Sequence, residues 1–342
     1  MIQYLLPPVT YYKANFHTHS TVSDGKLTPE EVRDAYKERG YSILAITDHS
    51  VMVAHQELNQ EDFLLLTGVE IDMEEQDNPV NLRDRKLHLC LISKDPNRQW
   101  IPFRDPRPIA NSVPYEALNE IGGMTRDYDP ENVNKVIAEC NRQGCLVIYN
   151  HPCWNLESYP EYAPLKGFWG MEYRNSASIA LGYDENNSWV YQDLLRLGSR
   201  MMPVCADDMH RPVNPQNGYP VLGGSWNMVG AKELSYEAVI AAMERGDLYA
   251  SCGPEIHSLT LEDGKLRLTC SPAAKVQLIA HNRYAQMDYA RDGKPMEGAE
   301  FDVSKWLKAN EGKDNAFLRL VVTAADGTYA VTRAYWMDEL KG

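Results

Sequence analysis

The sequence predicts an α/β protein in which a parallel barrel is followed by a small antiparallel β-sandwich. Up to residue 252, short apolar runs of strand length alternate with amphipathic helical stretches, which is typical of parallel sheets. Beyond Gly253-Pro254, polar and apolar residues alternate between turn sequences, which favours a sandwich. A chain of 342 residues has room for both, because barrels take roughly 250 residues and sandwiches about 100. We expect domains at 1–252 and 253–342.

Each expected barrel strand ends at a polar residue. Most of these strands are continuous apolar runs, as expected for strands buried on both faces. Because parallel strands direct their carboxyl ends to one rim, the polar residues that follow them should gather there. In chain order, the strands are expected at 11–16, 41–47, 63–69, 86–92, 145–150, 168–173 and 201–206.

The first expected helix has a clear start, in which Thr28 caps, Pro29 takes the first helical position and acids fill the first turn. Further helices are expected at about 130–143, 185–198 and 235–246, and sandwich strands at 256–261, 266–270, 276–280 and 317–323. Two long loops, 72–86 and 93–128, interrupt the alternation. The second contains Arg98, Arg104, Arg107 and Arg126, which either contact a substrate or form a solvated surface.

Charge and cysteine usage narrow the class of protein. A formal charge of −14 and a pI near 5.1 argue against a nucleic-acid polymer as partner. Small anionic substrates stay open because bound cations change the local field. Seven cysteines without CxxC spacing, no signal peptide and no long apolar run predict a reduced, cytoplasmic protein with no membrane partner. The oligomeric state is left open.

Side chains of metal-binding types follow the expected strands. Six of the nine histidines belong to this set. Imidazole and carboxylate without thiolate suit Zn²⁺, Mn²⁺ or Fe²⁺, and the set exceeds what one ion needs, so we expect two or three divalent ions. The nine candidate metal ligands are His17, His19, Asp24, His49, Glu70, His88, His151, Asp208 and His210.

Strand alternation selects within two doublets. Side chains of adjacent strand residues point to opposite faces, so Asp208 shares a face with His210 whereas Asp207 does not. Asp48 and His49 must likewise point apart. We therefore expect Asp208 and His49 to be ligands, and Asp207 and Asp48 to orient imidazoles from behind.

The motifs occur in a fixed order between residues 15 and 210, and together they resemble the PHP (polymerase and histidinol phosphatase) family of metal-dependent phosphoesterases. The motifs are His17-Thr-His19 followed by Ser-Asp24-Gly, Thr47-Asp48-His49, Gly68-Val69-Glu70, the isolated His88, Asn150-His151-Pro152 and Asp208-x-His210.

This resemblance implies a distorted seven-stranded α/β barrel with a trinuclear site that hydrolyses phosphate esters. It also implies three ligand groups, in which Glu70 bridges the first two ions. The groups are His17, His19, Glu70 and Asp208 for the first ion, Glu70, His88 and His151 for the second, and Asp24, His49 and His210 for the third.

The expected activity is hydrolysis of a small phosphorylated metabolite, a phosphomonoester or nucleotide-type ester, by a hydroxide shared between two ions. The candidate catalytic residues are Glu70, Arg174 and His210. Arg174 would hold a phosphate oxygen or else pair with Glu172 or a rim carboxylate. If the third ion is absent, His210 or His49 would protonate the leaving oxygen. Trp154 either stacks a base or packs internally.

Two alternatives differ in kind from this activity. Metal-dependent amidohydrolase barrels also begin with His-x-His, although the later motifs do not follow their order and no lysine stands at a strand end to bridge metals. The second alternative is a non-catalytic metal-binding interaction protein whose sandwich docks a partner. His257 and His281 have no partner at ligand spacing and are expected to be structural.

Overall fold

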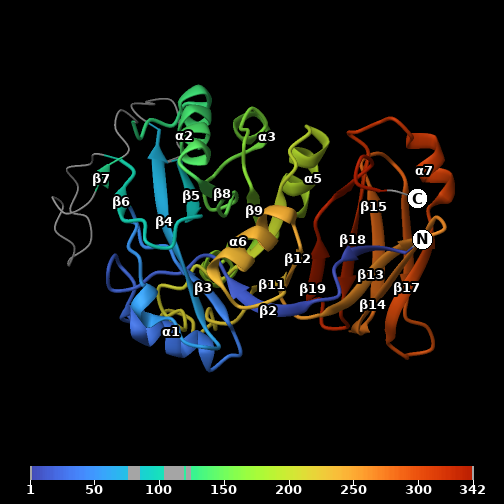
Figure 1. Cartoon of the computed structure of the whole chain (residues 1–342), viewed down its shortest axis with the longest axis horizontal. Helices are drawn as coiled ribbons and strands as arrows, with labels where there is room; N and C mark the ends of the chain where they lie inside the picture. The colour runs from blue at the N-terminus through green and yellow to red at the C-terminus, as the bar shows by residue number, and fades with distance from the viewer. Residues whose placement is uncertain (1, 76–84, 104–118, 121–124, 341–342) are drawn as a thin grey trace.

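The structure is a computed structural model that describes residues 2–75, 85–103, 119–120 and 125–340 (Figure 1). Its largest feature is a 14-stranded sheet that runs through both parts of the chain. In Figure 1 the C-terminal strands form the right-hand part of the molecule, and both termini lie there. The mixed α/β fold predicted for the chain is confirmed.

The N-terminal part of the sheet contains all seven expected strands, which neighbour one another in chain order. From the outer edge inward, the order is β10 (Met202–Ala206), β9 (Gly170–Asn175), β8 (Cys145–Tyr149), β5 (Lys86–Ser93), β4 (Leu64–Glu74), β3 (Ile43–Ile46), β2 (Thr10–Asn15), β11 (Trp226–Ala231) and β12 (Leu248–Ser251). Strands β3 and β8 are buried along their whole length, as their continuous apolar sequences predict.

The expectation that all barrel strands are parallel is wrong for β5. This strand runs antiparallel to both β4 and β8. The other neighbouring pairs from β10 to β2 are parallel. Because β5 is reversed, its first residues lie at the same rim as the last residues of the parallel strands, so a ligand near the start of β5 still reaches that rim.

The backbone ladder of the described strands does not close into a ring, so the predicted barrel is not confirmed. Strand β10 forms an edge of the sheet order. A side chain, not a ladder, connects it to β11: the Asn227 amide donates to the Cys205 carbonyl and accepts from the Cys205 amide, each at 3.0 Å. A buried amide thus satisfies backbone groups that a closed ladder would have paired.

The predicted helices form, with ends set by capping residues. Thr28 and Glu31 make a reciprocal capping box, and Asp129 and Ser235 cap the second and sixth helices. The sequence analysis did not predict α4, which lies directly after β9. The helices are α1 (Pro29–Lys37), α2 (Pro130–Arg142), α3 (Tyr159–Tyr162), α4 (Ser176–Leu181), α5 (Ser188–Arg196), α6 (Tyr236–Arg245) and α7 (Ser304–Asn310), with a 3-10 turn at Gln56–Leu58.

The C-terminal part consists of two antiparallel sheets that share one apolar core, as expected for a sandwich. Residues such as Leu259 and Leu268 from one sheet and Leu278 and Leu320 from the other are buried together. One sheet has the order β1 (Gln3–Leu6), β13 (Ile256–Glu262), β14 (Lys265–Ala273) and β17 (Met296–Asp302); the other continues from β12 through β19 (Tyr329–Thr332), β18 (Phe317–Thr323), β15 (Lys275–Ala280) and β16 (Ala285–Tyr289), with β20 (Tyr335–Trp336) beside β18.

Backbone pairing crosses the expected boundary at residue 252 in two places. Strand β1 pairs with β13, and β12 pairs with β19. The two parts therefore share a sheet as well as side-chain contacts. A further two-stranded pair joins β6 (Trp100–Ile101) to β7 (Asn119–Glu120).

All seven cysteines are free thiols, and five of them are buried. Among the described residues, no helix combines the length and apolar character needed to span a bilayer.

Candidate metal centre

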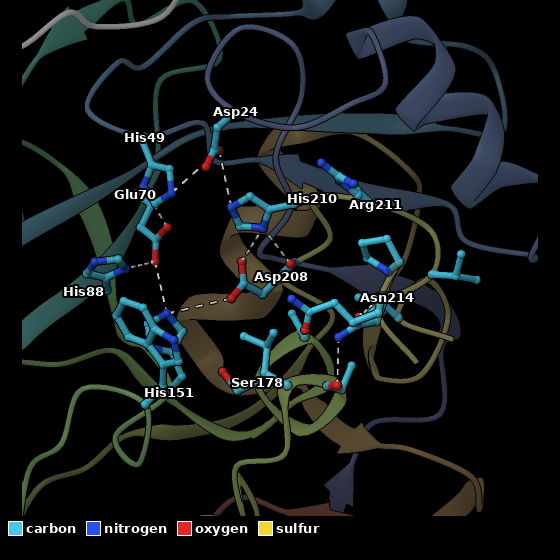
Figure 2. A pocket seen from close by; sticks show the side chains of 18 residues that line it. Asp24, His49, Glu70, His88, His151, Ser178, Asp208, His210, Arg211 and Asn214 are labelled. Carbon is cyan, nitrogen blue, oxygen red and sulfur yellow. Dashed lines mark hydrogen bonds and ion pairs between the residues drawn. The ribbon is translucent and has the colours of Figure 1, made fainter. Parts of the chain in front are cut away.

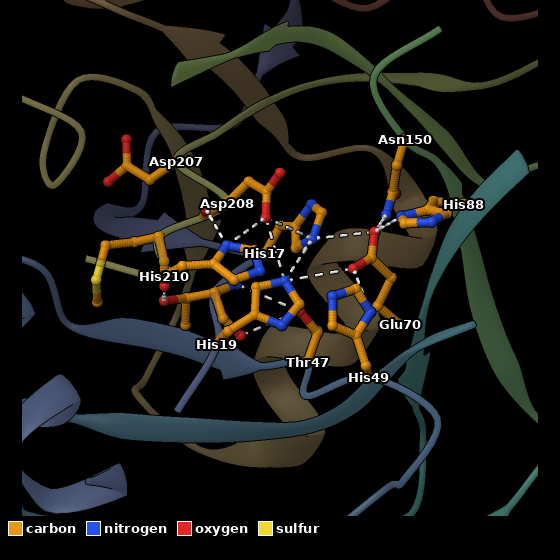
Figure 3. Close-up of polar contacts among 12 residues, drawn as sticks. His17, His19, Thr47, His49, Glu70, His88, Asn150, Asp207, Asp208 and His210 are labelled. Atoms are coloured by element: carbon orange, nitrogen blue, oxygen red, sulfur yellow. Dashed lines mark hydrogen bonds and ion pairs between the residues drawn. The ribbon is translucent and has the colours of Figure 1, made fainter. Parts of the chain in front are cut away.

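All nine predicted ligands converge at one end of the N-terminal strands; we call these nine residues the ligand cluster (Figures 2 and 3). The segments after β2 and β10 meet there through an isolated bridge between Thr18 and Met209. The His19 amide donates to the Met209 carbonyl at 3.1 Å, and the Asp208 amide donates to the His17 carbonyl at 2.9 Å. Backbone bonds therefore hold the first and last motifs side by side.

The turn that carries Asp24 depends on Gly25. A Cβ atom at this position would lie 2.5 Å from the His19 carbonyl oxygen, closer than any packing allows. The Ser-Asp-Gly turn needs glycine because the backbone passes directly against the strand end. Close approach, not an unusual backbone angle, is the reason.

The deepest part of the cluster contains two imidazoles and two carboxylates. The Nε2 atoms of His17 and His19 lie 3.2 Å apart. His19 Nε2 is 3.1 Å from Asp208 Oδ1 and 3.3 Å from Glu70 Oε2. All four side chains are buried, so the ligand atoms face one another and are screened from bulk solvent.

Glu70 lies at the centre of the cluster (Figure 3). Beyond the first two histidines, His88 Nδ1 lies 3.0 Å from its carboxylate, His49 Nδ1 3.1 Å and His151 Nε2 3.3 Å. The strand was expected to end here, but Glu70 lies in the middle of β4. His88 lies near the start of the reversed β5 and pairs with Asp72 across the ladder.

Asp24 organises a shallower group at the mouth of the site (Figure 2). Its Oδ1 atom lies 3.3 Å from His210 Nε2, 3.8 Å from His49 Nε2 and 3.9 Å from His19 Nδ1. The side chains of His210 and His49 are about one-third exposed. This group is therefore the part of the cluster that solvent and solutes reach first.

The geometry groups the ligands slightly differently from the resemblance. His19 joins the Asp24 group through its second ring nitrogen, and His49 also joins Glu70 and His88. His151 forms a group with His17 and Glu172. The expected four-residue group of His17, His19, Glu70 and Asp208 occurs with the same membership.

Neighbouring charges in the cluster shift one another's pKa values. Burial alone would lower the pKa of His19, but hydrogen bonds to Asp208 and Glu70 raise it to about 10. Burial would raise the pKa of both carboxyls, yet the charge of His17 and its neighbours holds both well below their usual range. Burial and the nearby His19 charge lower the pKa of His49 to about 4.

The residues present fit divalent cations. His19 Nδ1 is buried and has no hydrogen-bond partner among the described residues, although such a nitrogen normally finds one. It faces the Asp24 group, in which four ligand atoms lie within 4.8 Å of one another. Nitrogen and carboxylate donors without sulfur are the set that Zn²⁺, Mn²⁺ and Fe²⁺ accept.

Glu172 is a functional residue that the sequence analysis missed, having considered it solely as a partner for Arg174. Its Oε1 lies 2.6 Å from His17 Nδ1. Its Oε2 accepts from the His151 amide at 2.8 Å and from the Asn175 side chain at 2.9 Å. A carboxylate behind a ligating imidazole fixes its ring orientation and tautomer. The available signal was a carboxylate near the carboxyl end of the strand expected at 168–173.

Asn155 and Asn150 also orient ligands. Asn155 Oδ1 lies 3.2 Å from His151 Nδ1, and the Asn150 side chain donates to Glu70 at 2.7 Å. Both amides are buried. These residues, together with Glu172, support the cluster from behind.

Asp48 and Asp207 lie outside the cluster, as expected, but the prediction that they orient imidazoles is wrong. Asp48 accepts four hydrogen bonds from the backbone and hydroxyls of Ser20 and Ser23. Asp207 accepts from the Gly223 and Ser225 amides. Both carboxylates fix loops instead.

Alternation is not what separates Asp208 from Asp207. Strand β10 ends at Ala206, and Asp208 has a left-handed backbone with φ of 52°. This turn directs the Asp208 carboxylate into the cluster, while Asp207 points away (Figure 3). Strained backbone of this kind is common at functional sites.

Arg174 does not reach the site. The register between β9 and β10 shifts after Glu172, which places Val204 opposite Glu172 but Cys205 opposite Arg174. The extra residue turns Arg174 off the face that Glu172 occupies. Its guanidinium donates to Asn186 at 3.1 Å, and it does not line the cavity at the cluster.

The loop arginines that the structure describes serve local contacts. Arg126 binds the Asp72 side chain and donates to Ser50 at 2.9 Å, and Arg98 binds the Gln143 carbonyl. Arg104 and Arg107 lie outside the described residues.

A cavity of about 420 Å³ opens beside the cluster. One side consists of cluster residues and Trp154, whose ring lies 4.9 Å from that of His88 and 5.0 Å from that of His151. The other side consists of α4 and the loop 211–221, including Arg211. Neither α4 nor a role for Arg211 was expected from the sequence.

Comparisons with known proteins identify the N-terminal segment. The family model of the PHP domain matches residues 15–150. No curated protein matches the chain.

Three solved structures are similar in part. A two-domain protein from Bacteroides vulgatus containing a predicted PHP-like metal-dependent phosphoesterase is 17% identical, with 97% of this chain and 98% of that chain covered and a TM-score of 0.44. A candidate metal-dependent phosphoesterase from Bifidobacterium adolescentis is 14% identical, with 60% and 92% covered and a TM-score of 0.36. An amidohydrolase from Chromobacterium violaceum, solved with sulfate and without metal, is 14% identical, with 69% and 96% covered and a TM-score of 0.36.

Scores this low do not establish a common overall fold, so the likeness to a known family depends on the matched segment. That segment holds six of the nine cluster residues, from His17 to His88. Residues 15–150 of this chain are therefore similar to the PHP domain family.

Proposed function

We propose that the protein is a metal-dependent phosphoesterase that hydrolyses a small phosphorylated metabolite. One observation carries the proposal: five imidazole nitrogens, from His17, His19, His49, His88 and His151, lie within 3.3 Å of the Glu70 carboxylate. A carboxylate with two oxygens and five imidazoles around it is placed to bridge cations. The PHP match over 15–150 supports the same function.

Two or three bound divalent ions would supply a hydroxide nucleophile and offset the charge that builds on the phosphoryl oxygens. The chain's own residues divide the remaining work. Glu70, Asp208 and the buried imidazoles hold the cations, and Glu172 keeps the His17 ring in one orientation. With two ions bound and the third position empty, His210, about one-third exposed beside the cavity, is placed to protonate the leaving oxygen.

We further propose that β2, β3, β4, β5, β8, β9 and β10 form a distorted seven-stranded barrel. The bridge between Thr18 and Met209, which joins the segments that follow β2 and β10, supports this. In this arrangement most of the strands contribute cluster residues to one rim of the barrel.

The test is an assay of the purified protein loaded separately with Mn²⁺, Zn²⁺ and Fe²⁺. We expect hydrolysis of para-nitrophenyl phosphate with at least one metal, and no comparable hydrolysis of simple amides or lactones. Glu70→Gln should lose both bound metal and hydrolysis, whereas Glu255→Gln, an exposed glutamate of the C-terminal part, should lose neither. Amide or lactone hydrolysis without phosphate release would instead identify an amidohydrolase. Full metal content without any hydrolysis would favour a non-catalytic metal-binding protein.

A further inference from the structure

The cavity beside the cluster has two chemically different walls (Figure 2). The wall opposite the cluster consists largely of apolar side chains, which we call the apolar shelf. They come from α4 and from the loop that follows the Asp208-x-His210 motif: Ala177, Ala180, Leu181, Val213, Pro215 and Val221.

Two large residues of the shelf are exposed beside the cavity. Leu181 is 56% exposed and Val213 is 50% exposed. Single exposed apolar residues are common on proteins, but these two line the same cavity as the metal ligands. A ligand held at the cluster would cover both, and removal of their surface from water would favour an apolar group at that position.

The shelf is held rigidly in place. The Asn214 and Asn217 side chains both donate to the Ala180 carbonyl, at 2.9 and 2.8 Å. The Asn214 side chain also accepts from the Gln216 amide at 2.8 Å. These bonds tie the loop to the end of α4, so the wall exists before a ligand arrives and little ordering cost opposes binding.

Arg211 gives this wall a positive charge. Its side chain is exposed, and within the described part of the chain the guanidinium has no hydrogen-bond or ion-pair partner. It follows His210 directly, so the shelf and the cluster meet at this point of the chain. Apart from the cluster carboxylates, the described residues that line the cavity include no acid. A planar guanidinium of this kind suits two phosphoryl oxygens.

The cavity is larger than a phosphate group alone would need. About 420 Å³ lies within the range of sites that hold metabolite-sized ligands. The geometry points to a substrate with a phosphoryl group between the cluster and Arg211 and an apolar or aromatic leaving group on the shelf. We propose that this protein acts on phosphomonoesters of apolar or aromatic alcohols; the inference rests on the proposed phosphoesterase function.

Equilibrium binding of two phosphonates, which cannot be hydrolysed, tests the proposal. Calorimetry on the Mn²⁺-loaded protein should show that phenylphosphonate binds at least about tenfold more tightly than methylphosphonate, since one apolar group in a pocket is worth 10-fold or more. Leu181→Gln should remove most of this difference without weakening methylphosphonate. Leu197→Gln is the matched control, because Leu197 is also 50% exposed but lies outside the cavity.

The Arg211 contact has an independent readout. Arg211→Gln should weaken both phosphonates by a similar factor, about tenfold, because they share the anionic group and differ in the apolar group alone. Arg283→Gln, at an exposed arginine of the C-terminal part, should change neither affinity.

The outcomes separate the two levels of inference. Equal affinities for the two phosphonates, or a preference that survives Leu181→Gln, would overturn the shelf. Unchanged affinities in Arg211→Gln would overturn the phosphoryl contact. If neither phosphonate bound and no phosphomonoester were hydrolysed by the metal-loaded protein, the proposed function itself would be wrong. Hydrolysis of glycerol phosphate as efficiently as phenyl phosphate would refute the shelf and leave the phosphoesterase intact.

Discussion

The two parts of the molecule bury charge in opposite ways. In the ligand cluster, Glu70 and Asp208 are enclosed by several imidazoles at hydrogen-bond distance. On the C-terminal side, Arg319 of β18 is 3% exposed. It donates to one amide, Gln192 Oε1, at 2.7 Å and lies over the rings of Tyr173 and Tyr191.

This difference indicates that the cluster carboxylates and Arg319 have different roles. Several carboxylates and imidazoles whose donor atoms face one another are suited to bind divalent cations from solution. A single guanidinium against two aromatic faces, with Nη1 left unpaired among the described residues, joins two parts of a fold. Breaking the first should cost function, and breaking the second should cost little.

The largest effect is expected from Glu70→Gln. The amide keeps the shape but removes the charge that five imidazoles share, so the cations lose their common ligand. We expect metal affinity to fall at least about a hundredfold, the upper end of what supporting residues alone cost, and hydrolysis to fall with it. Elemental analysis after dialysis and a phosphatase assay measure both. A Glu70→Gln protein with wild-type metal content would refute the bridging role.

The next effect concerns Glu172→Gln. The His17 ring would lose its 2.6 Å carboxylate partner, and we expect a 10- to 100-fold loss of metal affinity, as is typical of residues behind a ligand. Added metal should restore much of the activity, because the ligand itself is intact. Metal titration of activity is the measurement. A loss that no metal concentration restores would mean that Glu172 acts on the substrate or the fold instead.

Asn227→Ala should reduce stability more than chemistry. It leaves the Cys205 amide and carbonyl without their partner, and each unsatisfied buried group costs about 1–3 kcal/mol. We expect the free energy of unfolding to fall by about 2–4 kcal/mol, measured by urea denaturation. Asn59→Ala, at a partly buried asparagine away from the β10–β11 contact, provides the comparison. An unchanged midpoint would show that the side chain does not join β10 to β11.

The smallest effect is expected from Arg319→Met. The unbranched thioether retains the packing of the stem and removes a buried charge that has no carboxylate partner, so loss and gain offset each other. We expect a change within about 1 kcal/mol and an unaltered metal content. Arg319→Ala, which removes the stem as well, should destabilise more. A large loss in Arg319→Met would show that the guanidinium itself stabilises the contact between the two parts.

Local signals in the sequence sufficed for much of this structure. Capping residues Thr28, Asp129 and Ser235 set helix starts correctly, because a cap acts within one turn. The nine cluster residues were singled out because, apart from the isolated His88, each belongs to a short motif, and the apolar runs between them marked the strands.

The direction and register of the strands could not be predicted from the sequence, because they depend on pairing between segments far apart in the chain. The reversal of β5 decides that His88 reaches the rim, and the register shift between β9 and β10 decides that Glu172 supports the cluster while Arg174 does not. Arg211 enters the cavity because asparagines of its loop bind α4.

The sequence by itself determined which ligand types this protein carries and where its regular elements begin, since both depend on neighbours a few residues apart. Tertiary structure alone decided that Glu172 contacts His17, that Arg211 and not Arg174 lines the cavity, and that the ladder of the described strands stays open. Pairing across the sheet can rotate a side chain from one face to the other with a single inserted residue, and no local pattern records that insertion.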